Sequence, residues 1–337
     1  MKVALYLPNG IYGGGERVLL MLAREFKKHG NDVIVYTRDS FDYNIVSSKV
    51  IKLSTTRNKF LQVLDAAKSL KSERVSHIII FGLDTILFWA TKIVGVKYIY
   101  SLRIDPKQVN WNKFMYNYII HHCYRIVFQT KKVQSYFDRQ VQAKSCVIFN
   151  PILDENLPDV QPLRQKKIVM AGRLSSEKNY PMALEAFSKV EKQGYSLYIY
   201  GVGPQEQELK KLVADLGIND NVFFEGQVNR VIDHIKNASI FILTSNSEGM
   251  PNALIEGMAM GMACISVDFP SGAASEIITN GVDGFVVPMN DVNALAEKLQ
   301  VLISNDCIRE SFQCKARKIR NRQDIDSIVD RWFNYIQ

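Results

Sequence analysis

Residues 3–36 read VALYLPNGIYGGGERVLLMLAREFKKHGNDVIVY and contain the unit from which the fold follows. Val3–Leu7 is a short apolar run that predicts a buried strand, and three glycines then precede apolar residues at helical spacing as far as Phe26. A second apolar run follows at Asp32–Tyr36. A strand, a helix and a second strand in this order predict two parallel strands joined by a crossover helix.

The same alternation continues to the end of the chain. Further strands are predicted at His77–Phe81, Tyr98–Leu102, Ile126–Gln129, Cys146–Phe149, Lys167–Ala171, Ser196–Tyr200, Val222–Phe224, Ile240–Leu243, Ala263–Val267 and Gly284–Val287. Helical patterns separate these runs, among them residues 58–70. Short strands that alternate with helices predict an α/β fold with parallel sheets. Two copies of one α/β architecture are the simplest account of 337 residues.

The boundary between the two copies is predicted in the segment Asn150–Pro158, which contains two prolines and several polar residues. We assign residues 1–152 to a first domain and residues 153–322 to a second. The segment 323–337 has a helical pattern whose apolar residues share one side: Ile325, Ile328, Val329 and Trp332. This helix is a candidate to pack back on the first domain.

The composition is that of a folded globular protein. Hydrophobic residues make up 47% and charged residues 23%, which argues against disorder and coiled coil. The most apolar region, residues 78–100, is broken by Asp84, Lys92 and Lys97, so no run of about 20 apolar residues predicts a membrane-spanning helix. No signal-peptide pattern follows Met1, and the five cysteines lack C-x-x-C spacing. These features favour a cytoplasmic protein with reduced thiols and no zinc site.

Charge is distributed unevenly along the chain. Residues 1–150 hold 23 Lys and Arg against 10 Asp and Glu, a net charge of +13, whereas residues 151–337 carry −5. Such an asymmetry indicates an anionic partner for the first half, for example nucleic acid, an anionic membrane surface or a phosphorylated substrate. A solvated basic surface is the alternative. Because no nucleic-acid-binding motif is present, we expect no nucleic-acid partner.

Four loops that follow predicted strands carry residues suited to an anionic ligand or a sugar, and the first two are suited to an anion. Gly13, Gly14 and Gly15 precede a helix, where backbone N–H groups can approach an anion, although a plain turn explains them equally well. The spacing is not G-x-G-x-x-G, so no dinucleotide fingerprint is present. Arg173 and Lys178 follow Gly172 in one strand-to-helix loop and could hold a diphosphate, the alternative being two exposed surface cations.

Two carboxylates stand eight residues apart in the segment SNSEGMPNALIEGMA, residues 245–259. Pro251 suits the first turn of a helix, which places Glu248 before the helix and Glu256 inside it. Carboxylates at these two places can accept hydrogen bonds from two ends of one polyhydroxylated ligand. Glu276, near the start of a helix after the strand at residues 263–267, is a further candidate at the same edge of the sheet, or part of an ordinary connecting loop.

Taken together, these segments resemble the retaining glycosyltransferases of the GT-B fold, in particular glycosyltransferase family 4. The resemblance covers nearly the whole chain and rests on the order of its motifs: the Gly13–Gly15 loop, Asn150-Pro151, GRL-x-x-EKN at Gly172–Asn179, YGVGP at Tyr200–Pro204 and the E-x7-E pair Glu248 and Glu256. It implies two Rossmann-like domains that face a central cleft. The first domain would bind the acceptor and the second a nucleotide-sugar donor.

The resemblance also implies roles for individual residues. Arg173 and Lys178 would hold the diphosphate, Glu256 the ribose hydroxyls and Glu248 the donor sugar. The implied donor-binding residues are Gly13, Gly14, Gly15, Gly172, Gly226, Gln227, Val228, Gly249, Met250, Pro251, Asn252, Glu256 and Glu276. No metal and no cofactor besides the donor is expected, because the two cations would offset the charge of the leaving diphosphate. The acceptor would attack the donor sugar on the face from which the leaving group departs, so the configuration of the sugar would be retained.

The segment SLRIDP, Ser101–Pro106, stands where many family members have a histidine. It is similar to the variant Ser-Glu-Arg-Asn-Asp-Pro of transferases that build bacterial surface polysaccharides. Arg103 and Asp105 match this variant and are catalytic candidates, whereas Leu102 and Ile104 depart from it. The segment Lys107–Arg125 mixes aromatic residues, Trp111 and Phe114 among them, with cations. It is either a helix at an anionic membrane surface or an ordinary buried helix.

The expected function is therefore the retaining transfer of a hexose or N-acetylhexosamine from a nucleotide-sugar to a glycan acceptor. UDP is the expected nucleotide, and the expected acceptor is a lipid-linked precursor of a bacterial surface polysaccharide at the cytoplasmic face of the inner membrane. A nucleotide-sugar epimerase or hydrolase of the same architecture is the alternative, and a polyanion-binding protein is a weaker one.

Overall fold

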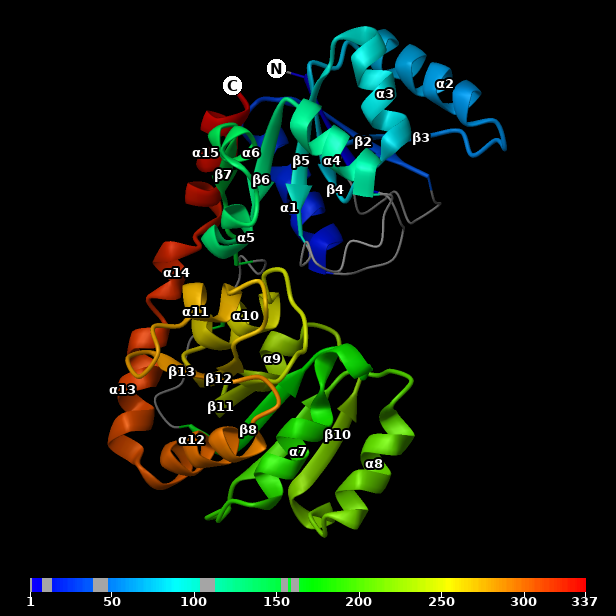
Figure 1. Cartoon of the computed structure of the whole chain (residues 1–337). Coiled ribbons are helices and arrows are strands. Elements are labelled where there is room, and N and C mark those ends of the chain that lie inside the picture. The colour runs from blue at the N-terminus through cyan, green and yellow to red at the C-terminus, as the bar shows by residue number, and fades with distance from the viewer. Residues whose placement is uncertain (1, 8–13, 39–47, 104–112, 153–156, 159–163) are drawn as a thin grey trace. The chain divides into compact units, whose positions relative to one another are not determined.

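The computed structural model describes residues 2–7, 14–38, 48–103, 113–152, 157–158 and 164–337. The chain forms two compact units. Residues 1–153 and 325–337 make up the first unit, and residues 154–324 make up the second (Figure 1). The chain therefore begins and ends in the same unit.

The first unit is built on a seven-stranded sheet in the order β3-β2-β1-β4-β5-β6-β7, with every neighbouring pair parallel. Its strands are β1 (Lys2–Leu7), β2 (Asp32–Thr37), β3 (Lys49–Lys52), β4 (His77–Phe81), β5 (Lys97–Leu102), β6 (Arg125–Phe128) and β7 (Ser145–Val147). Its helices are α1 (Gly14–Lys28), α2 (Lys59–Ser72), α3 (Thr85–Val94), α4 (Lys113–His122), α5 (Lys131–Ser135), α6 (Arg139–Ala143) and α15 (Ile325–Ile336).

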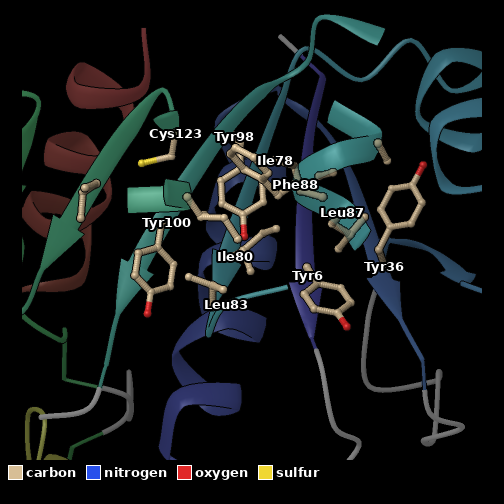
Figure 2. Close-up of a cluster of buried hydrophobic side chains, with 14 of the residues drawn as sticks. Tyr6, Tyr36, Ile78, Ile80, Leu83, Leu87, Phe88, Tyr98, Tyr100 and Cys123 are labelled. Carbon is tan, nitrogen blue, oxygen red and sulfur yellow. The ribbon is translucent and has the colours of Figure 1, made fainter. Parts of the chain in front are cut away.

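Alternate side chains of these strands enter two separate cores, because successive residues of a strand point to opposite faces of a sheet. Tyr6, Ile78 and Tyr98 lie in the core on the face covered by α2, α3, α4, α5 and α6, part of which is drawn in Figure 2. Leu5 and Ile79 lie in the core on the other face, which α1 and α15 cover. Burial on both faces explains why the central strands are almost wholly apolar.

The last helix is an integral part of the first unit. Ile328, Val329, Trp332 and Ile336 of α15 are fully buried beside residues of α1 and the sheet. The Tyr335 hydroxyl also donates hydrogen bonds to the Ile126 and Lys144 carbonyl oxygens, at 3.0 and 2.5 Å. These contacts join the C-terminal segment to strands that lie about 200 residues earlier in the sequence.

The second unit has a six-stranded parallel sheet in the order β10-β9-β8-β11-β12-β13. Its strands are β8 (Gln165–Ala171), β9 (Ser196–Tyr200), β10 (Val222–Gly226), β11 (Ala238–Leu243), β12 (Ala263–Val267) and β13 (Gly284–Val287). Its helices are α7 (Tyr180–Ser188), α8 (Glu206–Asp215), α9 (Val231–Ile235), α10 (Asn252–Ala259), α11 (Ala273–Ile277), α12 (Val292–Ser304), α13 (Asp306–Ala316) and α14 (Ile319–Arg322).

The strand order reverses between β1 and β4 in the first unit and between β8 and β11 in the second. At such a switch point neighbouring strands send their connections to opposite faces, which leaves a crevice at the carboxyl ends of the strands. The predicted α/β class and all the strands predicted from sequence are confirmed. β3 is an additional edge strand that the sequence analysis did not predict. None of the described helices is long and apolar enough to span a membrane.

Candidate functional site

The loop after β8 lies at the switch point of the second sheet. Gly172 adopts a φ of +154°, a conformation that side chains rarely allow, and its carbonyl oxygen accepts a hydrogen bond of 2.9 Å from the Tyr180 hydroxyl. A single 3-10 turn (Ser176–Lys178) then leads into α7. The Arg173 guanidinium is exposed and makes no hydrogen bond or ion pair with any residue that the structure describes. It is therefore available to an anionic ligand.

Lys178 lies against Glu248, although the two residues are 70 positions apart in the sequence. The Lys178 ammonium is 2.5 Å from Glu248 Oε1, and the Ser245 hydroxyl donates to the same oxygen at 2.8 Å. The Thr244 hydroxyl donates to the Lys178 carbonyl oxygen at 3.0 Å, which holds the backbone of the lysine beside the end of β11. Because both side chains are largely buried, with 27% of Lys178 and 15% of Glu248 exposed, the pair fixes the position of the ammonium group.

The loops after β8 and β9 touch through their backbones. A Cβ atom at Gly201 would lie 2.0 Å from the Gly172 carbonyl oxygen, and one at Gly203 would lie 2.3 Å from the Leu174 carbonyl oxygen. No side chain fits at such distances, so the glycines of the YGVGP segment are required by packing. The Gly201 N–H also donates to the Gly226 carbonyl oxygen at 2.7 Å. Three consecutive loops of the second unit are thus connected by their main chains.

Glu256 lies within α10 and is half-buried, eight residues after Glu248. The next residue, Gly257, has no room for a side chain because a Cβ atom there would approach the Phe241 ring to 2.9 Å. The close contact between α10 and β11 therefore positions Glu256. Pro251 is the residue that precedes α10 and not part of its first turn, a small correction to the sequence analysis.

The remaining donor-site candidates lie in loops at the carboxyl ends of the strands. The Ser271 hydroxyl donates to the Gly249 carbonyl oxygen at 3.2 Å, which connects the loop before α11 to the loop that carries Glu248. Glu276 is a half-buried residue of α11. The other candidates in this unit are Gly226 at the end of β10, the exposed Gln227 and the half-buried Val228 after it, and Met250 and Asn252 beside the start of α10.

The first unit contributes two groups of candidates. Gly14 and Gly15 begin α1, and a Cβ atom at Gly15 would meet nothing within 4 Å, so packing does not require glycine there. Arg103 follows the end of β5, where its side chain contacts Ser101, Asn150 and Phe81. Gly13 and Asp105 lie outside the described residues, as does the whole of the segment 107–112.

His121 and His122 are the last two residues of α4, and both have structural partners. His121 Nε2 lies 2.6 Å from Asp138 Oδ2, and a hydrogen bond to the Asn117 carbonyl oxygen together with Asp138 raises the pKa of the imidazole. The His122 ring stacks on Tyr118 with 4.0 Å between ring centroids. Within the part of the chain that the structure describes, no three His, Cys, Asp or Glu side chains are grouped as metal ligands would be.

The second unit, residues 155–319, matches the family described as Glycosyl transferases group 1. An exopolysaccharide phosphotransferase of Streptomyces coelicolor is 36% identical over 173 residues, which cover 50% of this chain but only 18% of that protein. A Campylobacter jejuni protein is 27% identical over 361 residues, which cover 100% of this chain and 98% of the relative. That relative is named GalNAc-alpha-(1->4)-GalNAc-alpha-(1->3)-diNAcBac-PP-undecaprenol alpha-1,4-N-acetyl-D-galactosaminyltransferase.

The whole chain also resembles solved structures. Anabaena HepE, crystallised in complex with UDP, superposes with a TM-score of 0.87 over 100% of this chain and 99% of HepE, at 16% sequence identity. At this identity the likeness concerns the fold, which is shared along the full length of both proteins.

Proposed function

Since residues 155–319 match the glycosyl transferases group 1 family and the chain has the GT-B fold, we propose that it is a retaining glycosyltransferase of bacterial polysaccharide biosynthesis. It moves a hexose or N-acetylhexosamine from a UDP-sugar to a glycan acceptor. The UDP complex of the structural neighbour supports the choice of nucleotide. The name of the C. jejuni relative, which specifies an undecaprenol diphosphate acceptor, supports a lipid-linked acceptor.

The observation that carries this proposal is the fixed Lys178 ammonium at the switch point of the second sheet, with the free Arg173 guanidinium in the same loop. Glu248 holds the side chain of Lys178 and Thr244 holds its backbone, so the position of the ammonium charge is preorganised. A preorganised cation stabilises negative charge that develops during bond cleavage, without the cost of reorganising solvent. We assign to Lys178 and Arg173 the stabilisation of the departing diphosphate.

The remaining roles follow from placement on the same edge of the sheet. Glu256 in α10 accepts hydrogen bonds from the ribose hydroxyls, and Glu248 contacts the donor sugar through the oxygen that Lys178 leaves available. The departing phosphate accepts the acceptor proton, so the reaction needs no separate side-chain base. We assign no metal and no further cofactor to this site, because the two cations supply the positive charge.

We further propose that the first unit docks on an anionic lipid surface, where a lipid-linked acceptor would be found. The neighbouring helices α2 and α3 expose five large apolar side chains, Phe60, Leu61, Leu64, Trp89 and Ile93. Cations lie in the same segments of the chain: Arg57, Lys59, Lys68, Lys71 and Lys92. Exposed apolar side chains among cations are typical of surfaces that bind anionic bilayers. Phe114 in α4 is exposed to 75% and extends this set.

The donor assignment is tested by titration calorimetry with a panel of nucleotides and UDP-sugars in EDTA. We expect micromolar binding of UDP, and weaker binding by the Glu256→Ala variant because the ribose contacts are lost. If no nucleotide binds the wild-type protein, the transferase proposal is wrong. A product assay then separates transfer to an acceptor from epimerisation or hydrolysis of the donor.

The lipid surface is tested by sedimentation with vesicles that contain anionic phospholipid. Phe60→Ser combined with Ile93→Ser should reduce the bound fraction several-fold, because these are the most exposed apolar side chains of the two helices. Trp111→Ser with Phe114→Ser tests the helix predicted from sequence in the same way. Val282→Ser, an exposed apolar residue of the second unit, is the matched control and should have no effect. Equal sedimentation of all four proteins would exclude this surface.

A further inference from the structure

Arg103 is a half-buried cation at the carboxyl edge of the first sheet. Its Nε donates to the Ser101 hydroxyl at 3.0 Å, and its Nη1 donates to Asn150 Oδ1 at 2.5 Å. The guanidinium carbon lies 3.7 Å from the centre of the Phe81 ring. The side chain is thus held in one orientation by two hydrogen bonds and one ring contact, which together keep the plane of the guanidinium fixed.

The groups that hold Arg103 are all neutral and come from β4, β5 and the segment after β7. Asn150 follows β7, and its Oδ1 also accepts a hydrogen bond of 2.8 Å from Gln129, which follows β6. Gln129 donates this bond through its Nε2, and its side-chain oxygen, Oε1, is buried and has no partner among the described residues. No described carboxylate forms an ion pair with Arg103, and its Nη2 donates to no described atom. Among the described residues, Arg103 therefore lacks a counter-charge and Gln129 lacks a hydrogen-bond donor for its oxygen.

Arg38 provides a contrast within the same unit. It follows β2, and its Nη2 forms an ion pair of 3.2 Å with Asp84, while its Nε donates to the Tyr6 hydroxyl at 3.0 Å. Burial lowers the pKa of Arg38, but Asp84 and Tyr6 more than offset this effect and the net shift is upward. Burial alone acts on Arg103 and lowers its pKa to about 9. Among the residues that the structure describes, Arg38 therefore has a counter-ion and Arg103 has none.

A cation withdrawn from water without a counter-charge is costly, and such groups are typical of sites where a ligand supplies the missing charge. The planar guanidinium fork matches the two oxygens of a carboxylate or phosphate. The remaining donors of Arg103 lie at the carboxyl edge of a parallel sheet, the edge at which α/β proteins bind ligands.

We propose that Arg103, oriented by Ser101 and Asn150, binds an oxyanion of the acceptor, a phosphate or a carboxylate group. This inference rests on the proposed transferase function and restricts its acceptor to an anionic glycan or a glycosyl phosphate. Gln129 acts through Asn150, because it shares the oxygen that holds Arg103 in place. Arg103 therefore selects the acceptor and takes no part in donor binding.

The test measures the binding of pyrophosphate by calorimetry in the presence of saturating UDP, which occupies the cations of the second unit. We expect Arg103→Gln to weaken pyrophosphate binding at least tenfold, and Arg103→Lys to weaken it less because the charge is retained without the fork. Arg125→Gln is the matched control, since Arg125 begins β6 at the opposite edge of the same sheet. Titration with acetate in place of pyrophosphate distinguishes a carboxylate subsite from a phosphate subsite.

Equal affinities of wild type and Arg103→Gln for both anions would overturn the inference, as would an equal loss in Arg125→Gln. Circular dichroism and urea unfolding of Arg103→Gln should match those of wild type, which shows that the variant is folded. Its UDP affinity should also be unchanged, because Arg103 takes no part in donor binding. If UDP does not bind the wild-type protein, the proposed function fails. Pyrophosphate binding with Arg103 and with Arg103→Gln is then compared in the Lys178→Ala background, which tests the inference about Arg103 independently of the donor site.

Discussion

In the second unit the cation at the sheet edge, Lys178, lies against a carboxylate, whereas in the first unit the cation at the sheet edge, Arg103, is held by neutral groups. Both units use the same doubly wound parallel sheet, so the architecture does not decide this difference. It is decided by single side chains at strand ends, Glu248 in one unit and Asn150 in the other. One fold can therefore present either a positioned and partly neutralised cation or a cation that pairs with no carboxylate among the described residues.

The two units also differ in how their loops are held. In the second unit, glycines bring the backbones of neighbouring loops into direct contact, as at Gly203 and Leu174. In the first unit, Gly15 has open space around it and no packing reason to be glycine. The second unit is thus suited to a rigid ligand site, and the glycine of the first unit is better explained by a ligand that approaches the backbone.

The largest effect should come from removal of Trp332, which belongs to the core of the first unit alone. Its side chain is fully buried in α15, so Trp332→Ala should cost about 3–5 kcal/mol of unfolding free energy. Urea unfolding measures this loss, while UDP binding, which we assign to the second unit, should persist below the transition. Val282→Ala, at an exposed site of the second unit, should change stability by less than about 0.5 kcal/mol. Loss of UDP binding with α15 disrupted would show that the two units are not separable.

Lys178→Ala tests the positioned cation. Turnover should fall by about 100- to 1,000-fold because a preorganised charge at the leaving group is lost. Lys189→Ala is the matched control, since this exposed lysine of the second unit bonds only Asn293 among the residues described. Steady-state assays with a UDP-sugar and circular dichroism on the same samples separate loss of chemistry from loss of fold. If Lys178→Ala turns over at the wild-type rate, the positioned cation of the second unit has no role in turnover, and this difference from the first unit has no functional meaning.

Paired glycine substitutions test the difference in loop packing. Gly203→Ala should destabilise the protein by about 1–3 kcal/mol, because the added methyl group would overlap the Leu174 backbone. Gly15→Ala should leave stability unchanged or raise it by up to about 1 kcal/mol, since α1 gains a better helix former, yet it should lower activity. Thermal unfolding and turnover are measured for both. Equal stability losses would contradict the assignment of Gly15 to a ligand.

The smallest effect is the dependence of stability on pH that His77, a buried residue of the first unit near two cations, should produce. Burial, and next Lys97 and Arg125, lower the pKa of His77 to about 4, below the value of about 6.5 in an unfolded chain. The unfolded state therefore binds the proton more tightly, and stability falls as pH decreases from about 6.5 towards 4. We expect a loss of about 1–2 kcal/mol between pH 7 and pH 5 from this residue. Urea unfolding of His77→Gln should show a correspondingly smaller change, and an identical change would assign the effect to other groups.

Local patterns in the sequence predicted nearly every strand, because each central strand is apolar on both faces and bounded by turns. β3 escaped prediction since only two apolar residues stand between Lys49 and Lys52 on an edge strand. Sequence motifs identified the candidate site residues of the second unit, but no motif could predict the contact of Lys178 with Glu248. It depends on which strands become neighbours in the sheet, as does the meeting of Arg103 with Asn150.

The placement of α15 has a consequence for synthesis of the protein on the ribosome. Every segment of the second unit is translated before the helix that completes the first unit. Domains generally fold as they emerge, starting from the N-terminus. Here the half that is made first cannot bury the apolar face shared by α1 and the sheet until α15 has left the exit tunnel. We therefore expect the second unit to fold earlier, and the nascent first unit to depend longest on chaperones.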